Sequence, residues 1–564
     1  MPEELNVLRT EAADLLLEWA RQAAPHYGPV GSMDLDRDGF PDAEGPSYYN
    51  QFAHFSMLLL SESIVPGATT KEREHFRSLA IANLRYILSI TDSDFHTPHY
   101  SRGRDWGRHV GEWLNYYALE SLKLMEAHDV GGAELRQALH TAIEGAVSHI
   151  AATMISRFGG SEAREEAPVT FPGNHATWHG LLVYRAGQYF ERPDWVQFAD
   201  DFFARWILPT QRPDGVWPEG EGIVVDYSMV TAQAVSLYAE ASDCDLARDS
   251  MARALGFFLA FQLPDGSSAV VVDGRMRHRP RPMLFFPPGF LRDPAGRTLC
   301  LDRARGGLQD LRSTGIADNG AQGLAFYGAF VQALMTWDDI SDIPSVVAPE
   351  VLPAARIDVG PWTALLGWQL TPEHTSRFIL ESQNFVEVYH ADSGYLVGTG
   401  NSKFTPRFST LRRRSAGRDY IPSAARCVRT SADEIVALYE LGADQVEVSL
   451  VREGDGLVVR FHQLTPPCDI EAGLMLDLGG GDEIDAGGTT HVVVPTALID
   501  HTFTEEAPLL RWGGRSFDVP AGSRLEYPII PHNPYTQTGL PEERSYVARL
   551  SIPLGAGPTL VTIR

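Results

Sequence analysis

The chain has 564 residues and a formal net charge of −26, with 44% hydrophobic and 21% charged residues. This length exceeds what a single hydrophobic core organises, and the composition is typical of a globular protein with two or three domains. The negative charge argues against nucleic acid or an acidic membrane surface as a partner, and no apolar run is long enough to cross a bilayer. The N-terminal stretch MPEELNVLRTEAADLLLEWA lacks the basic start and apolar core of a signal peptide, which predicts a cytoplasmic protein.

An acidic segment near the N-terminus, DLDRDGFPD, has the spacing of a calcium-binding loop. Asp34, Asp36 and Asp38 stand where the first carboxylate ligands of such a loop stand, and a glycine follows them. The twelfth position, which should hold a bidentate glutamate, holds Gly45 instead. Two interpretations stay open: a structural calcium site, or an acidic turn in which the aspartate side chains accept hydrogen bonds from backbone N–H groups.

Residues up to about 340 are predicted to be helical, because apolar side chains recur every three to four positions. The pattern begins in LNVLRTEAADLLLEWARQA and returns over 48–62, 71–90, 107–127, 133–156, 174–190, 194–207, 228–241, 245–262 and 320–337. Helices of similar length with no strands between them predict stacked helical hairpins that close into a ring or solenoid. The segment 264–318 is predicted to be a long loop of the kind that carries function.

The segment FPGNHATWHG (171–180) places an unusual set of polar side chains on one predicted helix: Asn174, His175, Trp178 and His179. Such side chains are costly to bury without partners, so they form either a polar cluster between helices or the wall of a pocket. Tyr227 follows His175 by 52 residues, where a loop enters the next but one helix. Each residue alone is more often structural, and only their combination points to a site.

From about residue 340 the pattern changes. Residues 341–361 are rich in proline and predict a linker. Beyond them, short alternating runs such as FVEVYHA, EIVALYEL and QVEVSLV are separated by glycine and aspartate turns. This spacing predicts an antiparallel β-sandwich over 362–564, after an α-helical domain over 1–340.

Together with VEVYHADSGYLVGTGNSK (386–403), these segments resemble the heparinase II/III-like and oligoalginate polysaccharide lyases. Those enzymes combine an incomplete (α/α) toroid with an antiparallel β-sandwich. They carry an Asn-His pair on one toroid helix, a catalytic Tyr about fifty residues later, and a His in an H-x-D-x-[GS]-[SFY] strand of the sandwich. The resemblance covers the domain order and three short motifs across most of the chain.

The resemblance implies a role for each matching position. Asn174 and His175 would neutralise a substrate carboxylate, Tyr227 would serve as base and acid, and His390, beside Asp392, would be the catalytic histidine of the sandwich. The family strand usually reads His-x-His-x-Asp, whereas Val388 occupies its first histidine position here. This departure weakens the case for a metal ion in the sandwich.

The implied reaction is β-elimination in an oligo- or polysaccharide that contains uronic acid. The hydrogen on C5 is hard to remove because the adjacent carboxylate is already negative, so donors aimed at that carboxylate stabilise the charge that develops. A tyrosine whose pKa is lowered by nearby cations takes the C5 hydrogen and returns a proton to the leaving oxygen. The reaction requires no cofactor, and the expected partner is an acidic glycan.

Further residues are predicted to contact the sugar. Aromatic and imidazole rings stack on pyranose faces, arginine pairs with carboxylates, and glutamate binds hydroxyls or a basic partner. The candidates are Tyr49, Arg108, His109, Trp113, Trp178, His179 and Glu219.

Three other functions fit parts of the same pattern. Helical toroids also host glycoside hydrolases that use two carboxylates, for which the candidates are Glu112, Glu219, Glu221 and Asp226. A uronyl epimerase would share the first half of the elimination, with reprotonation of C5 from the other face. A non-catalytic carbohydrate-binding or scaffold protein would use the polar cluster for structure alone.

Overall fold

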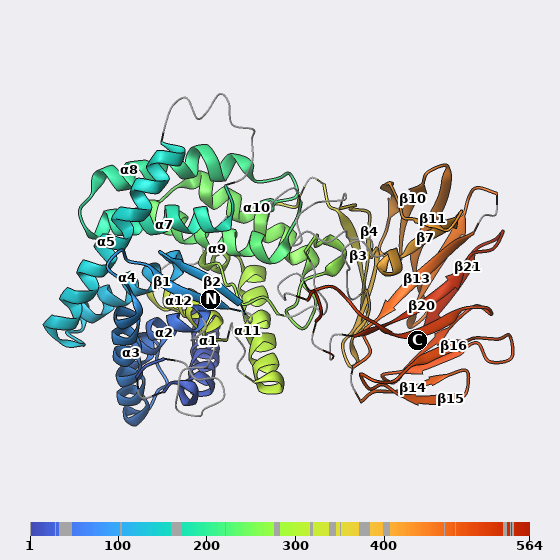
Figure 1. Cartoon of the computed structure of the whole chain (residues 1–564), viewed down its shortest axis with the longest axis horizontal. Helices are drawn as coiled ribbons and strands as arrows, with labels where there is room; N and C mark the ends of the chain where they lie inside the picture. The colour runs from blue at the N-terminus through green and yellow to red at the C-terminus, as the bar shows by residue number, and fades with distance from the viewer. Residues whose placement is uncertain are drawn as a thin grey trace. The chain divides into compact units, whose positions relative to one another are not determined.

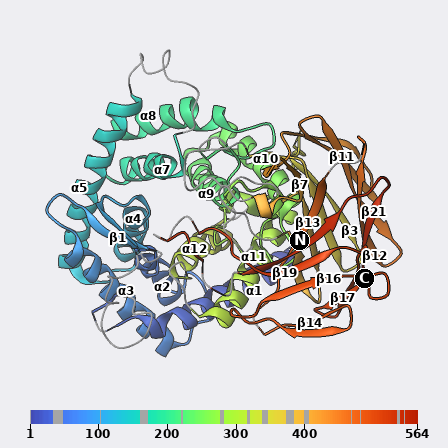
Figure 2. The same ribbon diagram turned by 45° about the vertical axis from the view of Figure 1, so that its right-hand side comes forward.

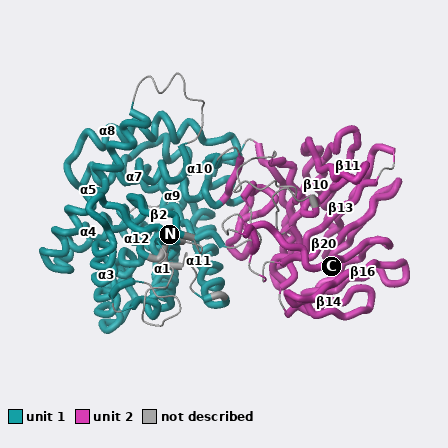
Figure 3. Tube along the Cα trace, in the orientation of Figure 1, with its two compact units in different colours: residues 1–221, 226–259, 282–349 teal, residues 222–225, 260–281, 350–564 magenta. Residues whose placement is uncertain are grey.

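The structure is a computed structural model (Figure 1). It describes residues 2–28, 30–32, 48–101, 104–159, 172–219, 222–275, 282–315, 320–337, 346–349, 351–371, 384–398, 406–466, 469–479, 481–533, 538–541, 543 and 546–564. The chain forms two compact units (Figure 3). Unit 1 comprises 1–221, 226–259 and 282–349, and unit 2 comprises 222–225, 260–281 and 350–564. Two segments of the predicted helical domain, 222–225 and 260–281, therefore belong to unit 2.

Unit 1 is built from helices, as the apolar spacing predicts. They are α1 (Pro2–Ala23), α2 (His54–Ser61), α3 (Thr70–Ile90), α4 (Glu112–Ala127), α5 (Gly132–Phe158), α7 (Asn174–Tyr189), α8 (Pro193–Phe202), α9 (Val225–Ser242), α10 (Asp245–Phe261), α11 (Pro294–Thr314) and α12 (Gly320–Thr336). Consecutive helices pack in pairs, α2 with α3, α4 with α5 and α7 with α8, and the second members contact one another in turn. The pairs form a ring (Figure 2), so the predicted incomplete (α/α) toroid is confirmed.

Two contacts establish the direction of α4 relative to α7. Glu112, in the first turn of α4, bonds His175 in the first turn of α7. Glu120, two turns further along α4, bonds Arg185 at 3.0 and 3.1 Å, almost three turns further along α7. Because both contacts advance in the same sense, the two helices run parallel and begin at the same level of unit 1.

The same argument places α9 beside α7. The indole N–H of Trp178 donates to the carbonyl of Val230 at 3.0 Å, and the hydroxyl of Tyr184 donates to the carbonyl of Ala241 at 3.3 Å. These contacts also advance together, so α9 runs parallel to α7. Three residues before the first contact, His175 on α7 is level with Tyr227 on α9, at the start of both helices.

Aromatic packing around Phe326 of α12 fills the centre of the ring. Its ring centroid lies 5.6 Å from those of Tyr117 and Trp178 and 6.5 Å from that of Trp113. The side chain of Gln233, on α9, donates to its carbonyl at 3.3 Å. Helix α12 therefore joins α4, α7 and α9 through one buried cluster.

Two parts of unit 1 differ from the predictions. A hairpin of β1 (Thr97–Ser101) and β2 (Arg104–His109) precedes α4, where the apolar spacing predicts helix from residue 107. Helix α11 lies inside the predicted loop 264–318; its start is capped by Asp293, whose carboxylate accepts from Ala295 N–H, with Pro294 in the first turn. Because its residues are on average hydrophilic, the spacing of apolar side chains does not predict this helix.

Unit 2 contains two antiparallel sheets. In the described residues, one sheet has the order β15-β14-β17-β18-β21-β12-β11-β10-β9, and the other has the order β16-β19-β20-β13-β6-β5-β4-β3, with β7 and β8 joined to it at β13. The strands are β3 (Ala354–Val359), β4 (Trp362–Gly367), β5 (Val386–His390), β6 (Gly394–Val397), β7 (Leu411–Ser415), β8 (Arg418–Tyr420), β9 (Ala424–Thr430), β10 (Glu434–Leu441), β11 (Asp444–Glu453), β12 (Gly456–Gln463), β13 (Ile470–Leu476), β14 (Glu483–Ala486), β15 (Thr489–Val492), β16 (Ile499–Thr502), β17 (Leu509–Trp512), β18 (Arg515–Asp518), β19 (Arg524–Ile529), β20 (Val547–Pro553) and β21 (Thr559–Ile563).

The two sheets share one hydrophobic core. Alternate residues of β4 and β5 in one sheet and of β10, β11 and β12 in the other are buried in it, which is the period-two pattern of a sandwich. The predicted antiparallel β-sandwich is therefore confirmed. The predicted linker 341–361 is wrong in its second half, because β3 occupies Ala354–Val359 and pairs with β4 along its whole length. In the part of the chain that the structure describes, no helix has the length and apolar character needed to cross a membrane.

Candidate functional site

Three parallel helices begin together in unit 1 and carry the polar residues singled out by the sequence. Glu112 opens α4, Asn174 and His175 open α7, and Tyr227 lies in the first turn of α9. Gly173, with φ of 97°, turns the chain into α7 in a conformation that side chains rarely adopt. The N-terminus of each helix carries a partial positive charge, so this end of the unit favours anionic groups.

Glu112 is the centre of the cluster. Its carboxylate Oε1 accepts from Nδ1 of His175 at 2.5 Å, and its Oε2 lies 3.5 Å from Nε2 of His179. The side chain of Glu112 is only 4% exposed, whereas that of His175 is 54% exposed. Since Nδ1 of His175 is taken by Glu112, its Nε2 is the nitrogen left to meet a ligand.

The charges of this cluster are interdependent. Burial alone would raise the pKa of Glu112, but the charge and hydrogen bond of His175 and the charge of His179 lower it to about 2. Removal from water lowers the pKa of His175, but Glu112 and then Glu219 outweigh this effect and raise it above its ordinary value. Burial and the neighbouring His175 keep the pKa of His179 below its ordinary value, although Glu112 opposes them. Glu112 therefore favours the protonated form of His175, whereas burial favours the neutral form of His179.

Asn174 presents its amide on the same helix start. It is buried, and its Nδ2 donates to Oε2 of Glu219 at 3.2 Å, while its Oδ1 has no hydrogen-bond partner within the described residues. Glu219 also acts on the charge of His175. A carboxylate of the protein itself thus accepts from the amide that the sequence assigns to a substrate carboxylate.

The β1–β2 hairpin forms one wall of the cluster. His109 of β2 bonds His99 of β1 through Nε2 and Nδ1, and the ring of Tyr48 stacks on His99 with centroids 4.3 Å apart. Burial lowers the pKa of His109, while Glu112 opposes the shift. Gly111 is needed beside this wall, because a Cβ there would come within 2.1 Å of the Tyr48 hydroxyl.

The two tryptophans predicted to contact sugar are core residues instead. Trp178 is fully buried and its N–H is satisfied by α9. Trp113 is also buried, with its ring centroid 5.1 Å from that of His175. Both indoles are part of the core that packs against the polar cluster. An indole in a core position cannot present a face to a pyranose ring.

The remaining predicted sugar contacts lie in different surroundings. Arg108 donates to Asp92 at 3.1 Å and to the carbonyls of Ile90 and His96, so its guanidinium fastens the hairpin. The side chain of Tyr49 and residue Glu221 lie outside the described residues. The calcium candidates Asp34, Asp36 and Asp38 do so as well, and among the described residues no group of three His, Cys, Asp or Glu side chains is arranged to hold a metal ion.

His390 ends strand β5 of unit 2 and is almost fully buried. Its Nδ1 accepts from the backbone N–H of Asp392 and from the guanidinium of Arg515, both at 3.0 Å, and its ring meets Trp362 edge to face. Burial, and then the charge of Arg515, lower its pKa below the ordinary value, against Asp392. His390 is therefore a neutral imidazole with its proton on Nε2.

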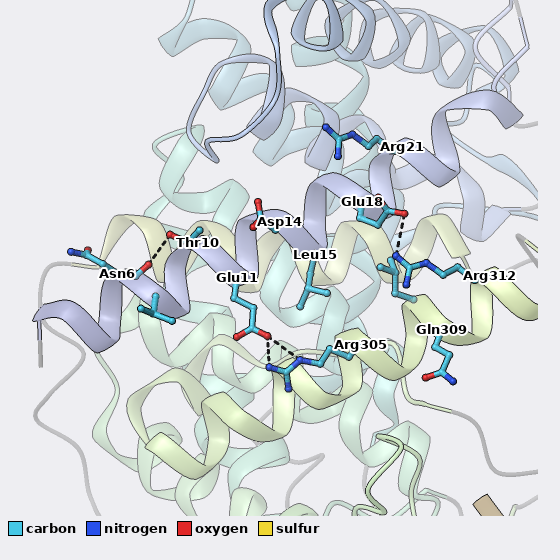
Figure 4. A pocket seen from close by; sticks show the side chains of 12 residues that line it. Asn6, Thr10, Glu11, Asp14, Leu15, Glu18, Arg21, Arg305, Gln309 and Arg312 are labelled. Atoms are coloured by element: carbon cyan, nitrogen blue, oxygen red, sulfur yellow. Dashed lines mark hydrogen bonds and ion pairs between the residues drawn. The ribbon is translucent and has the colours of Figure 1, made fainter. Parts of the chain in front are cut away.

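A separate hollow of about 930 Å³ lies between α1 and α11 (Figure 4). Two ion pairs join the helices across it, Glu11 with Arg305 and Glu18 with Arg312, the latter at 3.2 Å. None of the residues that line it is aromatic. We interpret the hollow as the seam where α11 joins α1.

The structure places the predicted residues Asn174, His175 and Tyr227 at neighbouring helix starts, but the sequence did not predict which residue holds His175. Glu112 stands out only as an acid in a first helical turn, and the sequence suggested it solely as a hydrolase carboxylate. Its partner His175 is 63 residues away, so no local pattern links the two. His99 and Tyr48 were not singled out, because a lone ring in a hairpin or short helix carries no signal.

Comparison with known proteins gives likeness in fold. No family model matches the chain, and no curated protein matches it. It is similar to a mutant of heparan sulfate lyase HepC from Pedobacter heparinus, at 11% identity and a TM-score of 0.45, over 97% of this chain and 82% of that one. It is also similar to chondroitinase AC lyase, at 12% identity and a TM-score of 0.42 over 99% and 82%, and to a heparinase III, at 8% identity and a TM-score of 0.44 over 97% and 83%. The similarity concerns the arrangement of the backbone and assigns no functional role to any residue.

Proposed function

We propose that the protein is a lyase that cleaves a uronic-acid-containing oligo- or polysaccharide by β-elimination. The observation that carries the proposal is the hydrogen bond that joins His175 to Glu112 beside the amide of Asn174, with Tyr227 in the first turn of the parallel helix α9. An imidazolium and an amide donor at a helix start suit a carboxylate, and a phenol on the neighbouring helix supplies a base.

Each residue has a defined task in this reaction. Nε2 of His175 and the amide of Asn174 would bind the uronate carboxylate, displacing Glu219 from Asn174. The phenolate oxygen of Tyr227 takes the proton from C5, and the electron pair of that C–H bond becomes the C4–C5 double bond. The C4–O bond breaks, and the leaving oxygen takes a proton from Tyr227, so the tyrosine ends as it began.

A hydrolase is less well supported by the same residues. An inverting or retaining hydrolase needs one carboxylic acid that stays protonated at working pH, which requires a raised pKa. The pKa of Glu112 is instead lowered to about 2, and its oxygens are engaged by two histidines. Glu112 is therefore an anion that holds a cation, which suits elimination better than acid catalysis.

The product masses test the proposal. Fragments of alginate, glycosaminoglycan, ulvan and glucuronan are incubated with the protein, and the molecular masses of the products are measured by mass spectrometry. Elimination splits the chain without adding water and leaves a double bond that absorbs in the ultraviolet. Hydrolysis adds one water per cut, and an epimerase leaves the chain length unchanged, so either result would exclude a lyase.

Substitution of Tyr227 tests the assigned base. Tyr227→Phe should lower kcat about 10²- to 10⁴-fold, the range for loss of a positioned acid–base group, with the fold retained. The matched control is Tyr238→Phe on the same helix, whose hydroxyl donates to Asp200 at 2.7 Å and takes no part in the proposed reaction. If Tyr227→Phe retains full turnover, Tyr227 is not the base. This result is the one expected if the polar cluster has a purely structural role. A part for His390 in the same reaction stays a prediction from the family resemblance.

A further inference from the structure

Resting on the proposed function, we propose that Glu112 is a positioning residue: it holds His175 as an imidazolium and directs Nε2 of His175 toward the substrate carboxylate. The inference adds a residue that the family motifs do not mark in this chain. Glu112 itself would touch no reacting atom.

The first support is the geometry of the shared carboxylate. Glu112 contacts His175 at 2.5 Å through one oxygen and approaches His179 to 3.5 Å through the other. The two histidines are four residues apart on α7, so they face the same side of that helix, one turn above the other. A single carboxylate from α4 thus restrains both rings, and the side chain of His175 is the more exposed of the two, at 54% against 26% for His179.

The second support is that Glu112 cannot easily move. Its side chain is buried in the first turn of α4, where a carboxylate is stabilised by the helix N-terminus. The next residue, Trp113, packs its ring against that of His175, and the preceding Gly111 lies against Tyr48. A buried anion of this kind would be strongly unfavourable without its cation, so the pair is held together from both sides.

The third support comes from the other charges that face His175. Glu219, on the loop before α9, adds a second negative charge, while His179 on the same helix and His109 on the hairpin are neutral at neutral pH, because their pKa values are lowered. Of the two acids, only Glu112 is hydrogen-bonded to the ring. Glu219 is bonded to Asn174 and would leave when substrate arrives, so Glu112 alone keeps His175 charged in the complex.

The consequence concerns the transition state. As the C5 hydrogen leaves, negative charge grows on the uronate carboxylate, and a cation at Nε2 of His175 stabilises it more than a neutral donor does. Without Glu112, His175 would lose its proton near neutral pH and turn freely. Substrate would still bind through Asn174, and the loss would fall mainly on kcat.

Glu112→Gln is the test, with Glu120→Gln as its matched control. Glu120 is also a buried acid of α4 and bonds Arg185, a cation of α7. It lies two turns further along α4 than Glu112, the residue that bonds His175. The pKa of His175 is measured by NMR titration of the labelled histidine ring. It should fall by about 1 to 3 pH units in Glu112→Gln, as expected for removal of an adjacent opposite charge, and stay unchanged in Glu120→Gln.

The kinetics give a second readout that a merely structural role would not move. Glu112→Gln should lower kcat about 10²-fold at a pH where the His175 ring is protonated in the wild type but not in the variant, change KM little, and recover activity as the pH falls and His175 regains its proton. Glu112→Asp, which keeps the charge on a shorter arm, should show a smaller shift in the same direction and serves if Glu112→Gln does not fold.

The outcomes separate the two claims. An unchanged His175 pKa in both Glu112 variants would overturn the positioning role, whatever the activity. A shifted pKa in a protein that eliminates none of the uronates would support the contact with His175 and refute the lyase. A uniform loss of kcat at all pH values in Glu112→Gln would also overturn the inference, because it would indicate a packing defect rather than a lost proton.

Discussion

Glu387 of β5 is a buried acid whose protonation should control the stability of unit 2. Its Oε2 accepts from the backbone N–H groups of Val270 and Val271, at 2.8 and 3.2 Å. Burial raises its pKa to about 8, although these two hydrogen bonds and the hydroxyl of Tyr395 oppose the shift. The nearby Asp265 adds to the rise. At neutral pH, Glu387 is therefore a protonated acid in the folded protein and a carboxylate in the unfolded chain.

The sign and size of the effect follow from this difference. Below pH 4.5, the folded and unfolded states both hold the proton, and above about pH 8 neither does. Between these limits the unfolded state binds fewer protons, so the free energy of unfolding falls as the pH rises. At about 1.4 kcal/mol per pH unit, the whole interval corresponds to about 5 kcal/mol.

The measurement compares the wild type with Glu387→Gln, which keeps the shape and the acceptor but does not titrate. Urea unfolding curves are recorded from pH 4 to pH 9, and the free energy of unfolding of the variant is subtracted from that of the wild type. Titrations common to both proteins cancel, so the difference should fall steadily up to about pH 8 and then stay level.

Two results would refute the reasoning. A difference that is constant from pH 5 to pH 8 would mean that Glu387 is not protonated in the folded state. A difference that rises with pH would mean that the N–H groups of Val270 and Val271 hold a carboxylate strongly enough to outweigh its burial.

Three further predictions concern the site and its supports. Trp178→Ala should lower the free energy of unfolding by about 3 to 5 kcal/mol in thermal or urea denaturation, because it empties a fully buried indole site; a surface-like loss below about 1 kcal/mol would contradict its core position. Glu219→Gln should lower KM for a uronate substrate in steady-state kinetics, because it removes the carboxylate that competes for the amide of Asn174; an unchanged KM would contradict this competition, and a higher KM would show that Glu219 helps to bind the sugar. Arg515→Gln should raise the pKa of His390 in an NMR titration, because the guanidinium charge beside Nδ1 disfavours protonation; a fall would contradict the hydrogen-bond assignment.

Much of the fold follows from spacing along the chain. Apolar side chains three and four residues apart can be buried only on one face of a helix, and alternating ones only on one face of a strand, so α1, α3 or β10 are predictable from short windows. The same spacing does not predict helix α11 or the β1–β2 hairpin. Helix α11 carries many charged residues, and the hairpin lacks a clear alternation of apolar and polar side chains. The prolines that flank strand β3 predict a linker rather than a strand.

In the candidate site, too, some features follow from the local sequence and others only from the tertiary structure. The sequence by itself determined that Asn174 and His175 open a helix and that Tyr227 opens another, since the turns before them and the apolar spacing after them are local properties. Only the tertiary structure decided that α4, α7 and α9 run parallel with their starts level, that Glu112 bonds His175, and that Trp178 points into the core. The physical reason is that these contacts join residues 52 and 63 positions apart in the sequence, so only the folded chain brings them together and encloses the carboxylate of Glu112 and the indole of Trp178.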